Sequence, residues 1–372
     1  MTGSITIAKL GETRISIHWT FAILIFWISM ISSGGQDLAW NLAFIATIFL
    51  CVILHELAHA GVARYFGIGT REISLLPIGG IAILERLPQR PVAELLIAVA
   101  GPIANFVIAL ILLFPASASL KHGMVEAIES INGHNFIVNV FMVNLTMGVF
   151  NLIPAFPMDG GRVLRALLSF RVNRLEATRI AARTGQILAV IAVGVAIFTN
   201  QNVVSSPGLL LVSLFIFYSA QAELQSFIYW STLDGHVVRE VTMKEFGRLD
   251  SSDKVSTAVD RLLSGAFHSF IVFSNEEPVG TLGRTGIIQS LAQSGNNTTV
   301  ADAMTKGVKI IADDMPLDKA YTAVMESPEQ PVIVKSNDKM IGVLDADNIL
   351  EFIVTRQAML AHRQTDKNQT II

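Results

Sequence analysis

The sequence predicts a polytopic α-helical membrane domain over residues 1–230, followed by a soluble α/β module over residues 231–372. The whole chain is 52% apolar and only 15% charged, with a mean hydropathy of +0.54, as is typical of membrane proteins. The long apolar runs all fall before residue 230, and several approach the ~20 residues that a helix needs to cross a bilayer. The remaining residues have the composition of an ordinary soluble domain.

We expect about six transmembrane helices, at residues 17–34, 39–63, 92–115, 136–155, 179–199 and 207–229. The first run is kept as a span because residues 1–17 do not have the basic and apolar regions of a cleavable signal peptide. The single cysteine, Cys51, excludes an internal disulfide, and we expect it to pack as a small apolar residue.

Basic residues gather on one side of the predicted spans, whereas the opposite loops contain only Lys121. The basic set is Lys9, Arg14, Arg64, Arg71, Arg86, Arg90, Arg162, Arg165, Arg171, Arg174, Arg179 and Arg183. By the positive-inside rule, this asymmetry places both termini and the C-terminal module in the cytoplasm.

The pentapeptide His-Glu-Leu-Ala-His at residues 55–59 lies inside an apolar segment, where ionisable side chains are costly. His55 and His59 are four residues apart, so both imidazoles share one helix face and can reach one metal ion. Imidazole suits zinc, and catalytic zinc usually has three protein ligands and a water. Glu56 would be the general base toward that water, whose pKa falls to roughly 7 at the metal. The alternative is two buried histidines and an acid, all satisfied by neighbours on the helix.

A third ligand has to come from another segment. Asp159 is the only acid between Glu129 and Glu176, and it follows Pro154 and Pro157, which break the fourth predicted span. Irregular backbone at membrane depth is tolerated only where it is buried in protein or lines a wet cavity. We therefore expect Asp159 at the metal, although a role as N-cap of the next helix would also explain it locally.

Three motifs of the first domain occur together: His-Glu-Leu-Ala-His at 55–59, Asn-Leu-Ile-Pro at 151–154 followed by Met-Asp-Gly-Gly at 158–161, and Gly-Pro-Ile-Ala-Asn at 101–105. With these motifs, residues from about 5 to 229 closely resemble the site-2 protease family of intramembrane zinc metalloproteases.

The resemblance implies one Zn²⁺ per chain, held by His55, His59 and Asp159, with Glu56 activating water. It also implies that Asn151 contacts the substrate or the transition-state oxygen; the alternative is a helix-breaking polar residue beside a proline. Asn105, in the motif of the third span, is a candidate substrate contact.

Gly79 and Gly80 separate two short apolar runs, and they can supply the positive φ angles of a tight hairpin. This membrane-associated hairpin resembles the β-loop of the family, which presents a strand edge to the substrate. Pairing with such an edge would hold the substrate extended, so Ile78, Gly79, Gly80 and Ile81 are candidate substrate contacts. A hairpin that only caps the helix bundle is the alternative. Residues 4–17 predict a second small hairpin.

The C-terminal module contains an approximate internal repeat. In each half an amphipathic helix, expected at residues 254–263 and 317–326, is followed by a buried strand at 269–273 and 331–334. A strand with a central glycine comes next. The repeat resembles a tandem pair of CBS (cystathionine-β-synthase-type) domains, which often bind adenine nucleotides and commonly associate, so a homodimer through this module is allowed.

Nucleotide-binding members of the CBS family usually have a hydroxyl residue and then an aspartate after that glycine. This chain has Gly-Arg-Thr-Gly at 283–286 and Asp-Ala-Asp-Asn at 345–348. Both aspartate positions are changed, and an acid that replaces the second hydroxyl would repel phosphate. We therefore expect a dimerisation or substrate-docking platform ahead of nucleotide sensing. If an adenine nucleotide binds, Arg284 and Asp347 are its candidate contacts.

These features predict a zinc metalloendopeptidase that cuts within or near transmembrane segments in regulated intramembrane proteolysis, with activity or substrate docking modulated by the CBS module. The alternative is a CBS-regulated channel or transporter, whose conduction path would spread polar groups along several spans. Here they concentrate at residues 55–59 and 151–162.

The resemblance implies a partner within the lipid bilayer: an anti-sigma factor, a membrane-tethered or pro-sigma factor, or a signal-peptide remnant. We expect a multi-pass protein of a bacterial or archaeal cytoplasmic membrane, with no direct contact to nucleic acid.

Overall fold

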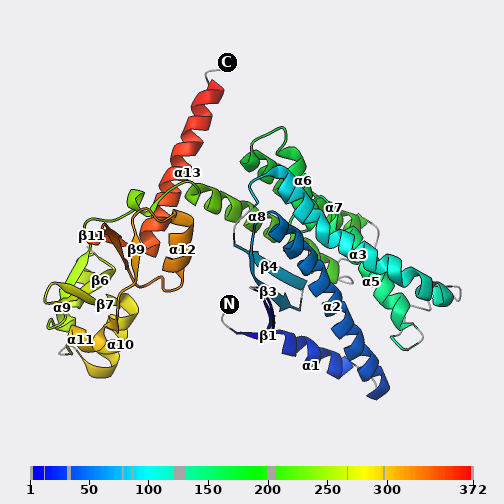
Figure 1. Cartoon of the computed structure of the whole chain (residues 1–372), viewed down its shortest axis with the longest axis horizontal. Coiled ribbons are helices and arrows are strands. Elements are labelled where there is room, and N and C mark those ends of the chain that lie inside the picture. Colours follow the sequence, from blue (N-terminus) through cyan, green and yellow to red (C-terminus); the bar gives the residue numbers. More distant parts are fainter. Residues whose placement is uncertain are drawn as a thin grey trace. The chain divides into compact units, whose positions relative to one another are not determined.

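The computed structural model describes residues 3–11, 13–31, 35–77, 79–85, 88–120, 131–133, 135–198, 207–265, 267–295 and 298–369. The chain forms two compact units, Met1–Gln225 and Ser226–Ile372, and the predicted division lies at residue 230. Figure 1 shows the first unit as a group of long helices beside a small sheet, and the second as a mixed α/β module.

The first unit is built on helices, most of them long and apolar. They are α1 (Phe21–Ile31), α2 (Gly35–Tyr65), α3 (Pro91–Leu120), α5 (Phe136–Asn151), α6 (Asp159–Leu168), α7 (Arg174–Phe198) and α8 (Pro207–Leu233). Among the described residues, four stretches are long and apolar enough to cross a membrane: Leu38–Tyr65, Pro91–Ser117, Arg174–Val195 and Gly208–Leu233. The chain is therefore a membrane protein.

Two of the predicted spans are shorter than expected. α1 has 11 residues and α5 has 16. At ~1.5 Å per residue these helices are about 16 and 24 Å long, whereas the hydrocarbon core of a bilayer is ~30 Å thick. The expected total of about six spans is therefore not confirmed, because only four helices in the described ranges have the required length.

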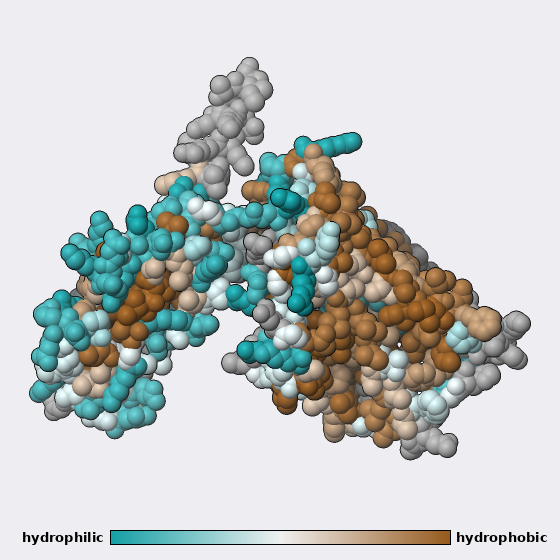
Figure 2. All heavy atoms as spheres, viewed as in Figure 1, coloured by the Kyte–Doolittle hydropathy of each residue, from teal (hydrophilic) through white to brown (hydrophobic). Residues whose placement is uncertain are grey.

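The outer surface of the helical unit is apolar. On α3, Leu110 is 69% exposed, Ile111 67% and Phe114 88%. Figure 2 shows hydrophobic side chains over much of the visible face of this unit, whereas the visible face of the second unit is mainly hydrophilic. Such a continuous apolar surface is unfavourable in water, but it matches lipid chains, in which only structures with internally satisfied backbone groups are stable.

Small side chains lie where these helices pack against one another. Ala98 of α3, Ala166 of α6, Ala181 of α7 and Ala220 of α8 are all buried. In lipid there is no hydrophobic driving force between helices, so close backbone approach and van der Waals contact replace it, and small residues permit that approach. Alanines therefore permit close approach of the helices in this bundle, alongside larger buried side chains such as Val138, Phe141 and Ile97.

Both predicted hairpins are present, and they join into one four-stranded sheet with the order β1-β2-β3-β4. The strands are β1 (Ser4–Leu10), β2 (Thr13–His18), β3 (Thr70–Leu76) and β4 (Gly79–Leu84). Each hairpin is antiparallel, but β2 and β3 pair in parallel, with Ser16 opposite Ser74. The sheet leaves β4 as an edge strand, and β4 packs against α2.

The second unit confirms the predicted repeat. Its elements are β5 (Gly247–Asp250), α9 (Val255–Leu263), β6 (Ser269–Ser274), β7 (Glu277–Gly283), α10 (Arg284–Ser294), α11 (Val300–Ala303), β8 (Thr305–Lys306), β9 (Ile310–Ala312), α12 (Leu317–Met325), β10 (Val332–Ser336), β11 (Lys339–Leu344) and α13 (Ala346–Gln369), with a short 3₁₀ turn at Val238–Glu240. In each half, a central strand pairs in parallel with the strand before it and antiparallel with the strand after it, as β5-β6-β7 and β9-β10-β11. The two halves are therefore copies of one α/β motif.

Candidate metal centre

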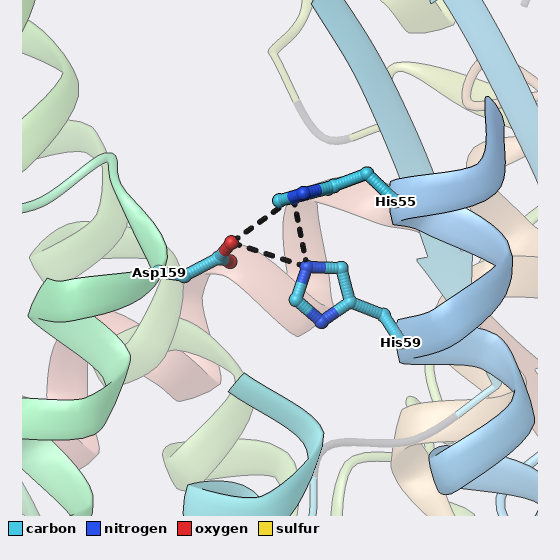
Figure 3. A group of neighbouring side chains, drawn as sticks. All are labelled: His55, His59 and Asp159. Atoms are coloured by element: carbon cyan, nitrogen blue, oxygen red, sulfur yellow. Dashed lines mark hydrogen bonds and ion pairs between the residues drawn. The ribbon is translucent and has the colours of Figure 1, made fainter. Parts of the chain in front are cut away.

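Three side chains from two helices meet at one point (Figure 3). His55 and His59 extend from successive turns of α2, and Asp159 is the first residue of α6. The Nε2 atom of each histidine lies 3.1 Å from Asp159 Oδ2, and the two Nε2 atoms are 3.1 Å apart. Within the part of the chain that the structure describes, this is the one group of three such side chains with metal-ligand spacing.

The separations of the three ligand atoms fit zinc. Zinc binds imidazole nitrogen and carboxylate oxygen at ~2.0–2.1 Å, which places the ligand atoms of a tetrahedral site about 3.3 Å apart. The observed 3.1 Å is close to that value. Two imidazoles and one carboxylate also leave the fourth position open, as in catalytic zinc sites. The donor set and its spacing therefore fit the metal that the sequence predicts.

The orientation of His59 is set by the backbone of α3. The Nδ1–H of His59 donates a hydrogen bond of 2.6 Å to the carbonyl oxygen of Ile97. Because a carbonyl can only accept, the proton of the neutral ring lies on Nδ1 and the lone pair of Nε2 faces Asp159. Such a second hydrogen bond fixes the tautomer and ring orientation of a metal-binding histidine.

α3 reaches the two histidines because residue 101 is glycine. A Cβ atom at Gly101 would lie 2.3 Å from His59 Nε2 and 2.6 Å from His55 Nε2. Both contacts are far shorter than van der Waals distance, so any side chain at this position would occupy the space between the ligands. The glycine of the motif at 101–105 is therefore required by close approach at the metal centre.

The break in the predicted fourth span positions Asp159. α5 ends at Asn151, an irregular segment follows, and α6 begins at Asp159 with Met158 as its N-cap. The alternative that Asp159 is an N-cap is therefore wrong, because Asp159 lies in the first helical turn. A carboxylate in that turn interacts favourably with the positive end of the helix dipole. A Cβ at Gly160 would be 2.1 Å from the carbonyl oxygen of Ile153, so this glycine lets α6 start directly against the preceding segment.

Glu56 lies beside the edge strand of the sheet. A Cβ at Gly80 of β4 would be 2.8 Å from Glu56 Cγ and 3.1 Å from its Oε1. Glu56 directly follows His55 on α2, so the predicted general base is next to a candidate ligand in the sequence and close to β4 in space. Gly80 is the residue that permits this approach. The structure thus brings one of the predicted substrate contacts to the predicted base.

The other predicted contacts are less closely tied to the ligands. Asn151 is the last residue of α5, and its side chain makes no hydrogen bond to the three ligands. Asn105 lies one helical turn beyond Gly101 and is buried, and its side-chain amide has no hydrogen-bond partner among the described residues. Gly79 has φ +140° in the hairpin turn. Ile78 and the side chain of Ile81 lie outside the described residues.

The two candidate nucleotide contacts are separated in the second unit. Asp347 lines a cleft of about 150 Å³, together with Asp345, Glu351 and His268. Arg284 begins α10 and is exposed, and it does not line this cleft. The cleft walls contain three carboxylates and neither lysine nor arginine, a charge pattern that repels phosphate.

A group of buried charges near the metal centre was not predicted from the sequence. Arg165 was expected as a flanking surface charge, but it is 2% exposed and pairs with Glu94. No role was predicted for Glu94. Glu94 is the only charged residue between Pro91 and Leu120, and an isolated acid in an apolar helix is the signal that could have identified it.

An apolar helix bundle with a histidine, histidine and aspartate site beside a glutamate defines a membrane-embedded metallohydrolase. The Peptidase family M50 profile matches residues 43–132 and 116–195, and the CBS domain profile matches residues 300–355. The zinc metalloprotease MJ0392 of Methanocaldococcus jannaschii is 30% identical over 350 residues, which are 94% of this chain and 96% of that protein.

Two further proteins are similar to parts of this chain. Stage IV sporulation protein FB of Bacillus subtilis is 32% identical over 138 residues, covering 37% of this chain and 44% of that protein. The solved structure of the site-2 protease from Methanocaldococcus jannaschii is 37% identical, covering 59% of this chain and 95% of that one, with a TM-score of 0.45. The chain belongs to Peptidase family M50, the site-2 protease family, and is a member with a C-terminal CBS module. This family membership supports the predicted enzyme and excludes the alternative prediction of a channel or transporter.

Gly101→Ala is expected to abolish metal binding while leaving all three ligands in place, because its methyl group would occupy the space between the two imidazoles. Metal content of the purified variant tests this. Gly61→Ala on α2 is the matched control, since a Cβ there meets nothing within 4 Å. Normal zinc content in Gly101→Ala would contradict the close approach of α3.

Asp345→Asn is expected to stabilise the CBS module at neutral pH. Burial raises the pKa of the Asp345 carboxyl above its ordinary value, so the folded state disfavours the ionised form. The cost is present when the carboxyl is ionised in both states, and it disappears as pH falls below the ordinary aspartate pKa of ~4. Thermal unfolding of parent and variant between pH 4 and 8 measures the difference, and a gain independent of pH would exclude a charge effect.

Proposed function

We propose that this chain hydrolyses a peptide bond within or near a transmembrane segment of another membrane protein, with zinc held by His55, His59 and Asp159. The observation that carries the proposal is the meeting of their three ligand atoms at 3.1 Å, two of them from α2, a helix long and apolar enough to span a bilayer. Bound zinc would polarise the peptide carbonyl and lower the pKa of a water molecule to ~7.

Glu56 acts as the general base in this proposal. It takes a proton from the attacking water and then delivers that proton to the leaving amide nitrogen, as a carboxylate next to a metal site can. Its support is geometric, since it follows His55 directly on α2 and contacts Gly80 of β4. Asn151 contributes a polar side chain at the end of α5, and we propose that it hydrogen-bonds to the substrate carbonyl.

The edge strand β4 holds the substrate. A transmembrane helix hides its peptide bonds in its own hydrogen bonds, so a protease must bind the substrate in an extended conformation. β4 has one paired side, toward β3, and its other edge pairs with no strand among the residues that the structure describes. Adding the substrate there as a further strand would satisfy its backbone groups. Because β4 lies against Glu56, the added strand would reach the base.

We propose the cytoplasmic membrane of a bacterium or archaeon as the location, with both termini and the CBS module in the cytoplasm. The flanking basic residues other than the buried Arg165 support this orientation. The substrate is proposed to be an anti-sigma factor, a membrane-tethered or pro-sigma factor, or a signal-peptide remnant. We further propose that cleavage contributes to regulated intramembrane proteolysis.

The CBS module is proposed to dock the substrate, or to modulate cleavage, and to pair with a second copy. Nucleotide sensing has less support, because the cleft that contains Asp345, Asp347 and Glu351 is acidic. Phosphate groups would meet carboxylates rather than arginine or lysine in that cleft.

Glu56→Gln is expected to abolish cleavage and to keep zinc, since glutamine cannot take the proton but does not touch the ligand set. His55→Ala, His59→Ala and Asp159→Ala should lose both zinc and activity, with a fall in turnover of at least ~10²-fold for each. Metal content and cleavage of a transmembrane model substrate, measured on the same preparations, test these roles. Full turnover by Glu56→Gln would show that another group is the base.

Removal of residues 231–372 is expected to leave zinc bound while changing the cleavage rate or the choice of substrate. The zinc ligands and the residues that orient them all precede residue 225. Parallel assays of the full and shortened chains on a native substrate would measure the effect. Equal rates on every substrate would remove the modulatory role of the module.

A further inference from the structure

One face of α3 contacts each part of the metal centre. Ile97 accepts the hydrogen bond from His59, and Gly101 lies against both imidazoles. Glu94 precedes them by three and seven residues, so all three positions share one face of the helix. Ile97 and Gly101 contact the two histidines. Glu94 lies on the same face of α3 and has other partners.

Glu94 connects α3 with the helix that carries the third ligand. Arg165 of α6 approaches Glu94 Oε1 with both Nε and Nη2 at 2.5 Å. The other oxygen, Oε2, lies 2.8 Å from Arg174 Nη2 of α7. Glu94 is 3% exposed and Arg165 2%, so the pair is shielded from water, and its charge-assisted hydrogen bonds are strong and directional.

Arg165 also contacts the segment that leads into Asp159. Its guanidinium lies over the ring of Phe156, 5.2 Å from the ring centroid. Phe156 is fully buried and lies three residues before Asp159. A weaker contact of 3.7 Å joins Arg165 Nη1 to Glu223 of α8. Arg165 thus contacts the segment before Asp159 and itself lies on the helix that begins at Asp159. Glu94 holds this arginine to α3.

α6 needs such a connection because the segments that join it to α5 and α7 do not fix its orientation. The helix has only ten residues. It follows an irregular segment of seven residues after α5, and it is separated by another short turn from α7. A rotation or shift of so short a helix would move Asp159 away from the two imidazoles on α2, and a displacement of ~1 Å is already large for a metal ligand.

We propose that Glu94 is a positioning residue of the metal centre: through Arg165 it fixes α6 against α3, the same helix that orients His59. Contacts with one face of α3 thereby set the positions of all three candidate ligands. This inference rests on the proposed zinc site, and it assigns to Glu94 no contact with zinc, water or substrate.

The first test is Glu94→Gln in the full chain, with zinc affinity measured by chelator competition and ligand geometry by the visible absorption of the Co²⁺-substituted protein. Removing an interaction that orients metal ligands typically weakens metal binding by ~10- to 100-fold, and that loss is expected here with an altered Co²⁺ spectrum. Glu176→Gln is the matched control. Glu176 also lies in the first turn of its helix and pairs with an arginine, Arg179, but that pair joins residues of α7 alone.

A second variant separates positioning from simple charge balance. Breaking a buried ion pair leaves an uncompensated charge, whereas replacing both partners with neutral groups is often neutral for stability. The double variant Glu94→Gln, Arg165→Met removes the buried pair and leaves only the partly exposed Arg174 and Glu223 without these partners, so it is expected to fold with a modest loss of thermal stability and still to bind zinc weakly. It also provides the readout if Glu94→Gln alone does not fold.

The outcomes are distinct. Parental zinc affinity and Co²⁺ spectrum in Glu94→Gln, or their full recovery in the double variant, would overturn the positioning role while leaving the zinc site intact. A parent chain that binds no zinc, or that binds it equally well after Asp159→Ala, would overturn the proposed function and this inference together.

Discussion

The convergence of His55, His59 and Asp159 on one point is the constraint on which the rest of the helical unit depends. Their ligand atoms are 3.1 Å apart, a separation that requires two helices from distant parts of the chain to be held within fractions of an ångström. In lipid, that precision has to come from close packing and buried polar contacts. The alanines between the helices, Gly101 against the histidines and Gly160 at the start of α6 are the means by which this chain achieves it.

The candidate metal site and the proposed substrate edge meet at the same helix. α2 carries two candidate ligands and the proposed base, and β4 lies against it at Gly80. A substrate strand added to β4 would therefore be placed by the element that places the zinc ligands. The buried charges of Glu94 and Arg165 extend the same framework to Asp159. In the proposed mechanism, substrate binding, ligand orientation and proton transfer would thus depend on a few contacts between α2, α3, α6 and β4.

The convergence of His55, His59 and Asp159 could be predicted from the sequence because their signals are local. Two histidines four residues apart define one helix face, and the prolines before Asp159 mark the break that exposes it. The repeat of the CBS module was equally readable, since α9 and α12 recur with the strands that follow them. Local patterns did not predict the parallel pairing of β2 with β3, or the pairing of Glu94 with Arg165 across 71 positions. Both depend on tertiary packing, as do the short lengths of α1 and α5.

The most direct test of the central claim is zinc K-edge X-ray absorption of the purified full chain. If His55, His59 and Asp159 hold the zinc, the spectrum will show four nitrogen or oxygen ligands at about 2.0–2.1 Å, with the multiple scattering of two imidazoles. Cys51 lies one helical turn before His55, so a sulfur ligand at about 2.3 Å would identify a different site on α2. Sulfur scattering, or zinc without histidine scattering, would contradict the ligand set of His55, His59 and Asp159.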